Sequence, residues 1–390
     1  MNRPAYILPI IIYAQFAGTS LWFAGNAIIP DLQQSWTLPE HSTSYVTSAV
    51  QLGFIVGTLV FAYLALADRF SPRKVFFSCS IIAAISNSAL LVAPEEITAL
   101  LILRFITGFF LAGIYPVGMK IAASWYEQGL GRALGYLVGA LVLGTAFPHL
   151  IRSLGAEIPW QQVILGVSLV AVSGGLLLLL LVPDGPFLPK GSPFKAKALG
   201  LIFRSKKFRA SALGYFGHMW ELYTLWAFIP LFLLGYSIQS DELINIPLWS
   251  FITIGVGFIG CAVGGLMSVK LGSVKVASIQ LLISGVCCVL SPFLFEAEWP
   301  IFMLFMLIWG VTVIGDSPQL STLIAQNAPR EYVGSALTIV NSIGFLVTVV
   351  SIQLTASLLL IVGVQYIFWL LIPGPVLCWF ALRSIREDNS

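Results

Sequence analysis

The sequence carries very little charge for its length of 390 residues. Asp, Glu, Lys and Arg together make up 9% of the chain, whereas a soluble domain carries about 25%. Hydrophobic residues make up 58%, and the mean hydropathy is +0.93. This composition excludes an ordinary soluble domain, gives no basis for a nucleic-acid partner, and predicts a membrane protein.

Several patterns that carry chemistry are also missing. The sequence lacks the ATP-binding motif G-x-x-x-x-G-K-[ST], so we expect any energy input to come from a gradient or from the solute itself. It shows neither a clustered nucleophile and base nor a complete set of metal ligands, so we expect no enzyme, no metal and no cofactor. The cysteines lie in or near apolar runs and are interpreted as packing residues: Cys79, Cys261, Cys287, Cys288 and Cys378.

What the chain does contain is long apolar runs. A membrane-spanning helix needs roughly 20 mostly apolar residues, and twelve such runs fit. They are apolar all round rather than alternating, which argues against barrel strands. We expect an all-α polytopic membrane protein with spans near 5–28, 45–66, 75–92, 97–124, 133–151, 162–182, 210–235, 247–268, 275–294, 301–325, 336–359 and 363–382.

The two halves of the chain are similar to each other. Phe16–Pro30 (FAGTSLWFAGNAIIP) matches Phe216–Pro230 (FGHMWELYTLWAFIP) at four positions, and we expect a helix in both. Helix-breaking residues of the fourth span recur in order at an offset of 202 (108 to 310): Gly108, Gly113 and Pro116 match Gly310, Gly315 and Pro318. Just beyond, Gly131-x-Ala-Leu recurs as Gly334-x-Ala-Leu. This order predicts a duplicated bundle, which is typical of transporters.

The longest polar interruption divides these halves. It covers residues 183–209 and is rich in Pro and Gly before it becomes basic. We expect an N-terminal six-helix bundle at 1–182, a cytoplasmic basic linker at 183–209, and a C-terminal six-helix bundle at 210–390. The second part of the linker could form a membrane-surface helix.

Basic residues gather on one side of the predicted spans. If the N-terminus is cytoplasmic, Arg152 is the only Lys or Arg in the opposite loops, which otherwise hold acids such as Asp31 and Glu40. This positive-inside pattern predicts that both termini are cytoplasmic. The N-terminal run resembles a signal peptide, but its match in the second half favours a retained first span. We expect a multi-pass protein of the plasma membrane, in a bacterium the inner membrane.

The turn between the second and third spans carries a family motif. It reads LALADRFSPRKV (Leu64–Val75) and resembles the signature loop G-x-L-A-D-R-x-G-R-K of the major facilitator superfamily. The matching residues are Leu66, Ala67, Asp68, Arg69, Arg73 and Lys74, while Leu64 replaces the leading Gly and Ser71-Pro72 replaces Gly-Arg. Arg104 and Gly108 also resemble a second family signature, R-x-x-x-G. The resemblance implies two pseudo-symmetric six-helix bundles, and a monomer that works by alternating access.

The resemblance also implies a gate. Asp68 would cap the start of span 11 at Gly334, close the cytoplasmic side together with Arg69 and Arg73, and release when the halves move. The alternative is a solvated turn that is basic only because it lies inside.

Five ionisable residues within predicted spans 4, 7 and 10 are candidates for function. Each costs about 2.5–3.5 kcal/mol at mid-membrane on insertion scales, so each needs a reason. They are Arg104 and Lys120 on span 4, His218 and Glu221 on span 7, and Asp316 on span 10. The resemblance implies that spans 1, 4, 7 and 10 line the central cavity.

The acids are the candidates for proton coupling. Asp316 precedes Pro318, which frees a carbonyl one turn back, and we favour proton coupling or cation binding there over a structural salt bridge. His218 and Glu221 stand three residues apart and share a helix face, which suits a proton relay, a polar solute contact, half of a metal site or an interhelical hydrogen bond. We therefore predict Asp316, Glu221 and His218 as proton-coupling residues.

The basic residues and aromatics of the same spans are candidates for solute binding. Lys120 near the cytoplasmic end could snorkel to the interface, whereas Arg104 is deeper and should pair with an acid or hold an anion. We predict solute contacts by Arg104 and by polar or aromatic side chains suited to an amphipathic solute: Gln15, Asn26, Tyr115, Trp220, Tyr223 and Trp226.

Taken together, the sequence predicts a secondary active transporter. It would move a small organic solute by alternating access, coupled to protons as symport or antiport, with membrane lipid as its surroundings. The alternative is a passive facilitator of a small organic anion or metabolite, which needs no titrating acid.

Overall fold

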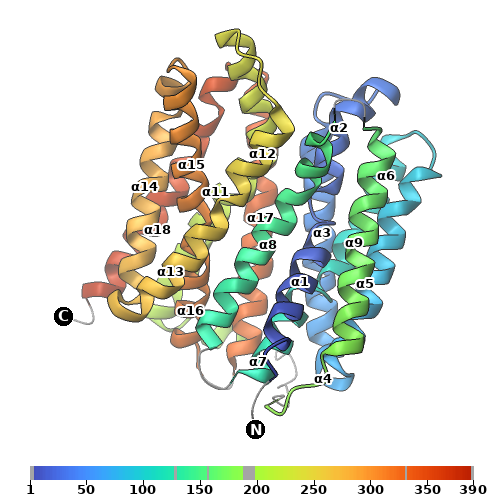
Figure 1. Cartoon of the computed structure of the whole chain (residues 1–390). Helices are drawn as coiled ribbons and strands as arrows, with labels where there is room; N and C mark the ends of the chain where they lie inside the picture. Colours follow the sequence, from blue (N-terminus) through green and yellow to red (C-terminus); the bar gives the residue numbers. More distant parts are fainter. Residues whose placement is uncertain (1–3, 127–129, 156–157, 188–197, 330–331, 388–390) are drawn as a thin grey trace. The chain divides into compact units, whose positions relative to one another are not determined.

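The computed structural model describes residues 4–126, 130–155, 158–187, 198–329 and 332–387. Within these ranges every regular element is a helix (Figure 1). Twelve helical segments, some of them interrupted, are long and apolar enough to cross a membrane. The prediction of an all-α protein with twelve spans is therefore confirmed.

The chain forms two compact units, Met1–Pro193 and Phe194–Ser390, each with six of the spans. The main helices of the first unit are α1 (Ile7–Thr19), α2 (Ala24–Ser35), α3 (Ser42–Tyr63), α4 (Leu66–Arg69), α5 (Pro72–Ser88), α6 (Ile97–Leu111), α7 (Tyr115–Trp125), α8 (Leu130–Ser153) and α9 (Trp160–Leu181). Those of the second are α10 (Ala198–Ile202), α11 (Lys206–Ser240), α12 (Ile246–Gly255), α13 (Gly257–Leu271), α14 (Ser273–Leu294), α15 (Trp299–Gly315), α16 (Ser317–Asn327), α17 (Val333–Leu359), the 3-10 helix η3 (Val364–Leu371) and α18 (Pro373–Glu387).

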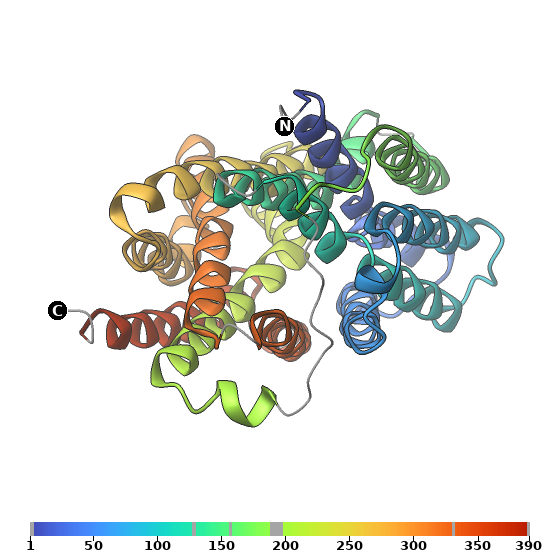
Figure 2. The ribbon, with the colours of Figure 1, turned by 90° about the horizontal axis from the view of Figure 1, so that it is seen from below.

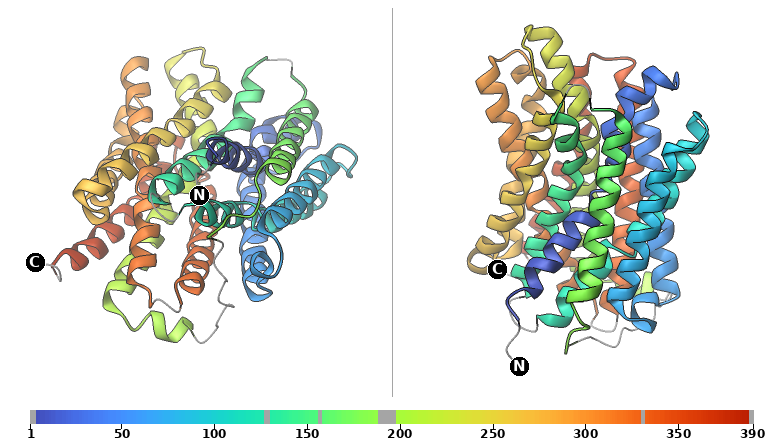
Figure 3. Two further views of the ribbon diagram at one scale, coloured as in Figure 1. Left: turned by 60° about the horizontal axis from the view of Figure 1, so that its bottom comes forward. Right: turned by 45° about the vertical axis from the view of Figure 1, so that its right-hand side comes forward.

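Within each unit the helices pack at varied tilts (Figure 2). In the first unit α1 lies beside α9 in both views of Figure 3, and α3 packs along α6. In the second unit α11 packs against α16, α17 and α18, and α15 against α12, α13 and α14. These contacts bury a continuous apolar core in each unit.

The matched glycines allow the closest helix contacts in both units. A Cβ added at Gly108 on α6 would overlap the Val50 carbonyl of α3, and one added at Gly310 on α15 would overlap the Thr253 carbonyl of α12. Small residues that let backbones approach are the usual basis of helix packing in membranes. The repeat therefore preserves the same backbone contact in each unit.

These contacts predict a matched pattern of stability changes. Gly108→Ala and Gly310→Ala should each lower the free energy of unfolding by about 1–3 kcal/mol, because the new methyl group overpacks a backbone contact. Gly131→Ala and Gly334→Ala should be neutral or gain up to about 1 kcal/mol from helix propensity, since the described structure has no atom within 4 Å of a Cβ added there. Thermal melting of the purified protein measures all four. Equal shifts at the four positions would show that backbone contact is not what distinguishes them.

Spans 4 and 10 are interrupted at the same place in the repeat. In span 4 the break lies between Leu111 and Tyr115, and in span 10 it lies at Asp316, which matches Ile114 at the offset of 202 (114 to 316). Pro116 and Pro318 stand just inside the helix that follows each break. Proline removes a helical hydrogen bond and is tolerated in the first turn, so each span divides there.

The first span departs from its copy in the second half. The chain breaks between Thr19 and Ala24, whereas the matching segment Phe216–Pro230 lies inside the continuous helix α11. The expectation of an unbroken helix over Phe16–Pro30 was therefore wrong. The stabilising partner of this break is Arg104, described below.

The predicted linker at 183–209 is only partly visible. Residues 188–197 lie outside the described residues, and the described remainder contains the five-residue helix α10. Span 7 begins earlier than predicted, at Lys206, because the Ser205 hydroxyl accepts a hydrogen bond from the Phe208 backbone N–H at 3.3 Å and caps α11.

Candidate functional site

One of the two buried acids named for the second unit lies at the break of span 10. Asp316 sits between the end of α15 and the start of α16. Because Pro318 has no N–H, the Ile314 carbonyl one turn earlier loses its helical donor. That carbonyl faces the Cys261 Sγ atom of α13 at 3.6 Å. The carbonyl that the sequence predicted to be free for a ligand is thus covered by a weak thiol donor.

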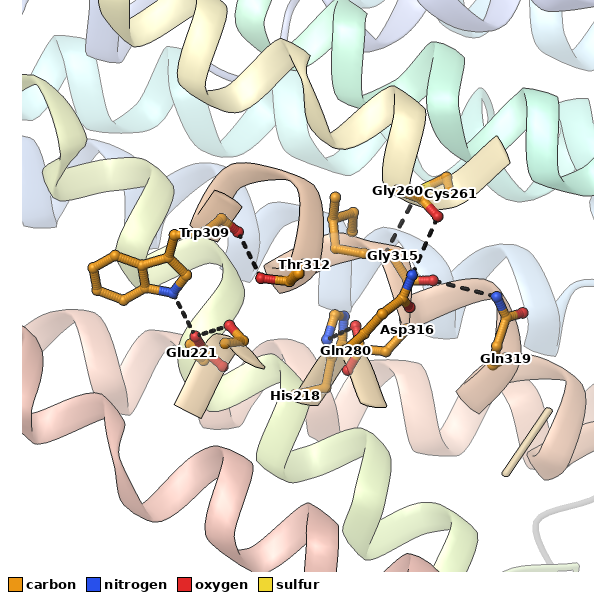
Figure 4. Close-up of polar contacts among 12 residues, drawn as sticks. His218, Glu221, Gly260, Cys261, Gln280, Trp309, Thr312, Gly315, Asp316 and Gln319 are labelled. Carbon is orange, nitrogen blue, oxygen red and sulfur yellow. Dashed lines mark hydrogen bonds and ion pairs between the residues drawn. The ribbon is translucent and has the colours of Figure 1, made fainter. Parts of the chain in front are cut away.

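Asp316 pairs with His218 of α11. The distance between His218 Nδ1 and Asp316 Oδ1 is 2.9 Å, and each side chain is 1% exposed (Figure 4). The His218 Nε2 atom has no hydrogen-bond partner among the described residues. A buried carboxylate without a partner would be strongly unfavourable, so each side chain stabilises the other in its place.

Glu221 has a separate set of partners. Its Oε1 atom accepts hydrogen bonds from Ser284 Oγ at 2.5 Å, Trp309 Nε1 at 2.9 Å and Cys288 Sγ at 3.4 Å (Figure 4). His218 and Glu221 stand less than one turn apart on α11, and both are buried. The structure brings His218 to α16 and Glu221 to α14 and α15, so the predicted pair supplies two polar sites of the second unit.

The predicted aromatic contacts of span 7 lie around these sites. Trp220 donates its indole N–H to the Leu370 carbonyl of η3 at 2.8 Å. The ring of Tyr223 contacts Trp226 and Phe345, with ring centroids 5.3 and 5.2 Å apart, and Tyr223 and Trp226 are buried. Their role in solute binding stays a prediction.

In the first unit Arg104 binds the break of span 1. Its Nη2 atom donates to the Leu21 carbonyl at 2.8 Å and the Trp22 carbonyl at 2.6 Å, and its Nη1 atom donates to Asn87 Oδ1 at 3.0 Å. The side chain is 2% exposed. These acceptors are carbonyl and amide oxygens, and the described residues place no carboxylate at the guanidinium. Of the two expectations for Arg104, pairing with an acid was wrong, because carbonyls freed by the helix break take the place of the acid. The expectation that Arg104 holds an anion stays a prediction.

Three other predicted solute contacts also lie in the first unit. Gln15 of α1 is buried against Gly118 of α7, and neither of its amide atoms has a partner in the described part of the chain. Asn26 of α2 donates from Nδ2 to Thr47 Oγ1 at 2.6 Å. Tyr115 is half-buried as the first residue of α7.

The signature loop is held to span 4 by Lys120. Its Nζ atom forms an ion pair with Asp68 and donates to the Ala67 carbonyl at 2.7 Å. Lys120 thus binds the loop, and its snorkelling to the interface stays a prediction. Arg73 donates to the Leu179 carbonyl at 3.3 Å, and Arg69 is exposed. The gate contact between Asp68 and the start of span 11 stays a prediction.

These features match a known family. A family model for the Major Facilitator Superfamily matches residues 11–352. The chain belongs to the Major Facilitator Superfamily. The family membership that the loop at Leu64–Val75 predicted is therefore confirmed. With its twelve candidate spans, the chain is a multi-pass membrane protein.

The similar proteins described next are named as transporters, not as enzymes. The chain is 30% identical over 132 residues to the niacin transporter NiaP of Acinetobacter baylyi, covering 31% of the chain and 29% of that protein. It is 22% identical over 286 residues to a probable sulfoacetate transporter, SauU, of Cupriavidus necator, covering 64% of each. The chain thus spans less than two thirds of either relative. The crystal structure of the human organic anion transporter MFSD10 (TETRAN) shares the fold, with a TM-score of 0.70 at 16% identity over 97% of the chain and 100% of that structure.

Sequence reasoning missed the uncharged partners of the buried charges. Asn87 supports Arg104, while Ser284 and Trp309 support Glu221. Gln280 lies flat against Gly315 at the break beside Asp316 and donates to the Gly260 carbonyl at 3.3 Å (Figure 4). The sequence signal for most of these partners is an amide or hydroxyl side chain inside an otherwise apolar run. The prediction considered mainly ionisable residues and did not include these side chains.

Proposed function

We propose that this chain is a secondary active transporter that moves a small organic solute by alternating access and couples that movement to protons. Membership of the superfamily supports transport. The observation that carries the coupling proposal is the buried pair of His218 and Asp316 at the break of span 10. Ionisable groups inside membrane spans commonly form proton pathways in transporters.

The pair offers a physical route from proton binding to helix movement. With Asp316 ionised, its carboxylate holds His218 of α11 against the break between α15 and α16. A proton added to the Asp316 carboxylate removes the negative charge that attracts an imidazolium, so the two side chains can separate. A helix flanked by proline at a break is a natural hinge. Protonation would then bias the position of α16 relative to α11.

Solute contacts are proposed in both units. In the first unit they are Asn26, Gln15 and Tyr115, and in the second Trp220, Tyr223 and Trp226. Arg104 is proposed as a positioning residue for the break in span 1, because its Nη atoms already donate to three acceptors. Two relatives are named as transporters of niacin and of sulfoacetate, and these names support a small organic solute.

The charge distribution supports a proposed orientation in the membrane. We propose a monomer in the plasma membrane, the inner membrane of a bacterium, in contact with its lipids. Both termini are proposed to be cytoplasmic, because the loops on that side carry most of the Lys and Arg residues.

The proposal predicts gradient-driven uptake in proteoliposomes. At one proton per solute, a pH difference of one unit should drive up to about tenfold accumulation or depletion, because one pH unit corresponds to about 1.4 kcal/mol. Radiolabelled niacin and sulfoacetate serve as probes, with the gradient imposed in each direction. Transport of either probe that ignores the gradient would identify a passive facilitator and contradict the proposed coupling, whereas absence of transport of both would exclude only these two solutes.

A further inference from the structure

Two amide side chains of the first unit are buried without being fully satisfied. Gln51 of α3 is 0% exposed, and neither its Oε1 nor its Nε2 atom has a partner among the described residues. Asn26 of α2 is 7% exposed, and its Oδ1 atom likewise has none in the described chain. Buried polar groups are almost always hydrogen-bonded, so these atoms require a partner other than the described residues, either a water or a solute.

The two amides belong to one region of the unit. Asn26 donates to Thr47 on α3, and Gln51 follows Thr47 by one helical turn on the same face. Phe54 lies one turn beyond Gln51 and contacts the ring of Trp22 in the span 1 break, with centroids 4.8 Å apart. The face of α3 that carries Gln51 is therefore turned toward α2 and the break.

The amides are not required by the repeated scaffold. At the offset of 200 (18 to 218), Asn26 matches Trp226 of the second unit. Spans 2 and 8 align at an offset of 203, because Gly57 contacts Phe109 as Gly260 contacts Val311 (57 to 260), and Gln51 then matches Ile254. Trp226 and Ile254 are both buried. The position of Gln51 can be filled by the apolar side chain of isoleucine, so Gln51 serves something other than packing.

The unpartnered donors and acceptors of Asn26 and Gln51 define which chemical group can bind to them. Asn26 offers an acceptor, and Gln51 offers two N–H donors and an acceptor. Nearby, a Cβ added at Gly25 would come within 3.0 Å of Arg104 Nε, which also lacks a partner in the described residues. The Nη atoms of Arg104 are already engaged by carbonyl and amide oxygens. A neutral group that carries a donor beside an acceptor satisfies both amides, whereas a carboxylate leaves the Asn26 oxygen without a donor.

We infer that Asn26 and Gln51 form a solute-recognition subsite for a planar carboxamide or ring lactam, with the aromatic pair Trp22 and Phe54 beside it. The inference deepens the proposed function, on which it rests, by naming the chemical group that the transporter recognises. Primary carboxamides pair with the side chains of Asn and Gln through reciprocal N–H···O bonds, and aromatic rings favour planar groups.

Equilibrium binding to the purified full chain tests the subsite without any gradient. The probes are nicotinamide, uracil, niacin and 3-acetylpyridine. Niacin replaces the carboxamide of nicotinamide with a carboxylate, and 3-acetylpyridine keeps the acceptor but loses the N–H donors. Nicotinamide or uracil should bind at least about tenfold more tightly than both niacin and 3-acetylpyridine. If neither nicotinamide nor uracil binds, the amides hold only water and the inference is wrong. The inference is also wrong if niacin or 3-acetylpyridine binds as tightly as nicotinamide and uracil.

A matched pair of variants tests the residue. Gln51→Ile reproduces the side chain found at Ile254, so the variant should fold with an unchanged or higher melting temperature and lose the carboxamide preference. Ser80→Ala removes another buried, unpartnered polar atom of the same unit and should bind like the parent. A Gln51→Ile protein that keeps its preference overturns the assignment. Specific binding without gradient-driven uptake would refute proton coupling alone, and gradient-driven uptake without carboxamide preference would refute the subsite alone.

Discussion

Replacing Asp316 with asparagine is expected to abolish proton-driven accumulation while leaving exchange of solute intact. Asparagine preserves the size of the side chain but cannot take up and release a proton. With a pH difference of one unit, the accumulation ratio should fall from as much as about tenfold to about one. Uptake of a radiolabelled solute into proteoliposomes, with and without the gradient, measures the ratio. Counterflow against unlabelled solute measures the exchange that should survive.

Two further variants locate the effect at Asp316. Asp31→Asn removes a partly exposed acid that pairs with Arg152 at 2.7 Å, and it should keep the response to the gradient. Glu221→Gln changes an acid whose Oε1 atom is held by donors from α14 and α15, whereas Asp316 pairs with the single side chain His218. We therefore expect Glu221→Gln to retain accumulation at reduced stability. Accumulation lost in Glu221→Gln and kept in Asp316→Asn would transfer the coupling role to Glu221.

The fold was largely predictable because it rests on apolar length and on helix breakers. The spans need roughly 20 apolar residues each, and that signal is local. The break at Asp316 could be anticipated from Pro318, since a proline acts on its own backbone. The close contacts at Gly108 and Gly310 could be anticipated from their recurrence in the repeat, although the carbonyls that they approach could not be named.

The site was less predictable because its charges find partners from distant parts of the chain. His218 and Asp316 lie 98 residues apart in the sequence (218 to 316), and neither residue type indicates which group faces it. The break in span 1 illustrates the same limit. Its segment contains no proline before Pro30, and the stabilising guanidinium comes from Arg104 on another span. A single sequence records the residues but not such pairings.

Arg104→Met is expected to lower the stability of the protein strongly, because the break in span 1 depends on the Arg104 guanidinium. At the offset of 202 (104 to 306) the second unit carries Met306, and there span 7 is the continuous helix α11. Methionine fits a buried site but leaves the carbonyls of Leu21 and Trp22 without their donor. Each buried acceptor left unsatisfied costs about 1–3 kcal/mol, so the free energy of unfolding should fall by about 3 kcal/mol or more. Chemical or thermal unfolding of the purified protein measures the change.

The control for Arg104→Met removes an arginine that is less deeply buried. Arg152→Met deletes a side chain that is 20% exposed and pairs with Asp31, and it should cost at most about 1 kcal/mol. Arg104→Lys should fall between the two, because an ammonium keeps the charge but lacks the planar fork that reaches three acceptors. If Arg104→Met unfolds like Arg152→Met, the break in span 1 is stabilised by its own packing. The asymmetry between the two units would then have a cause other than this guanidinium.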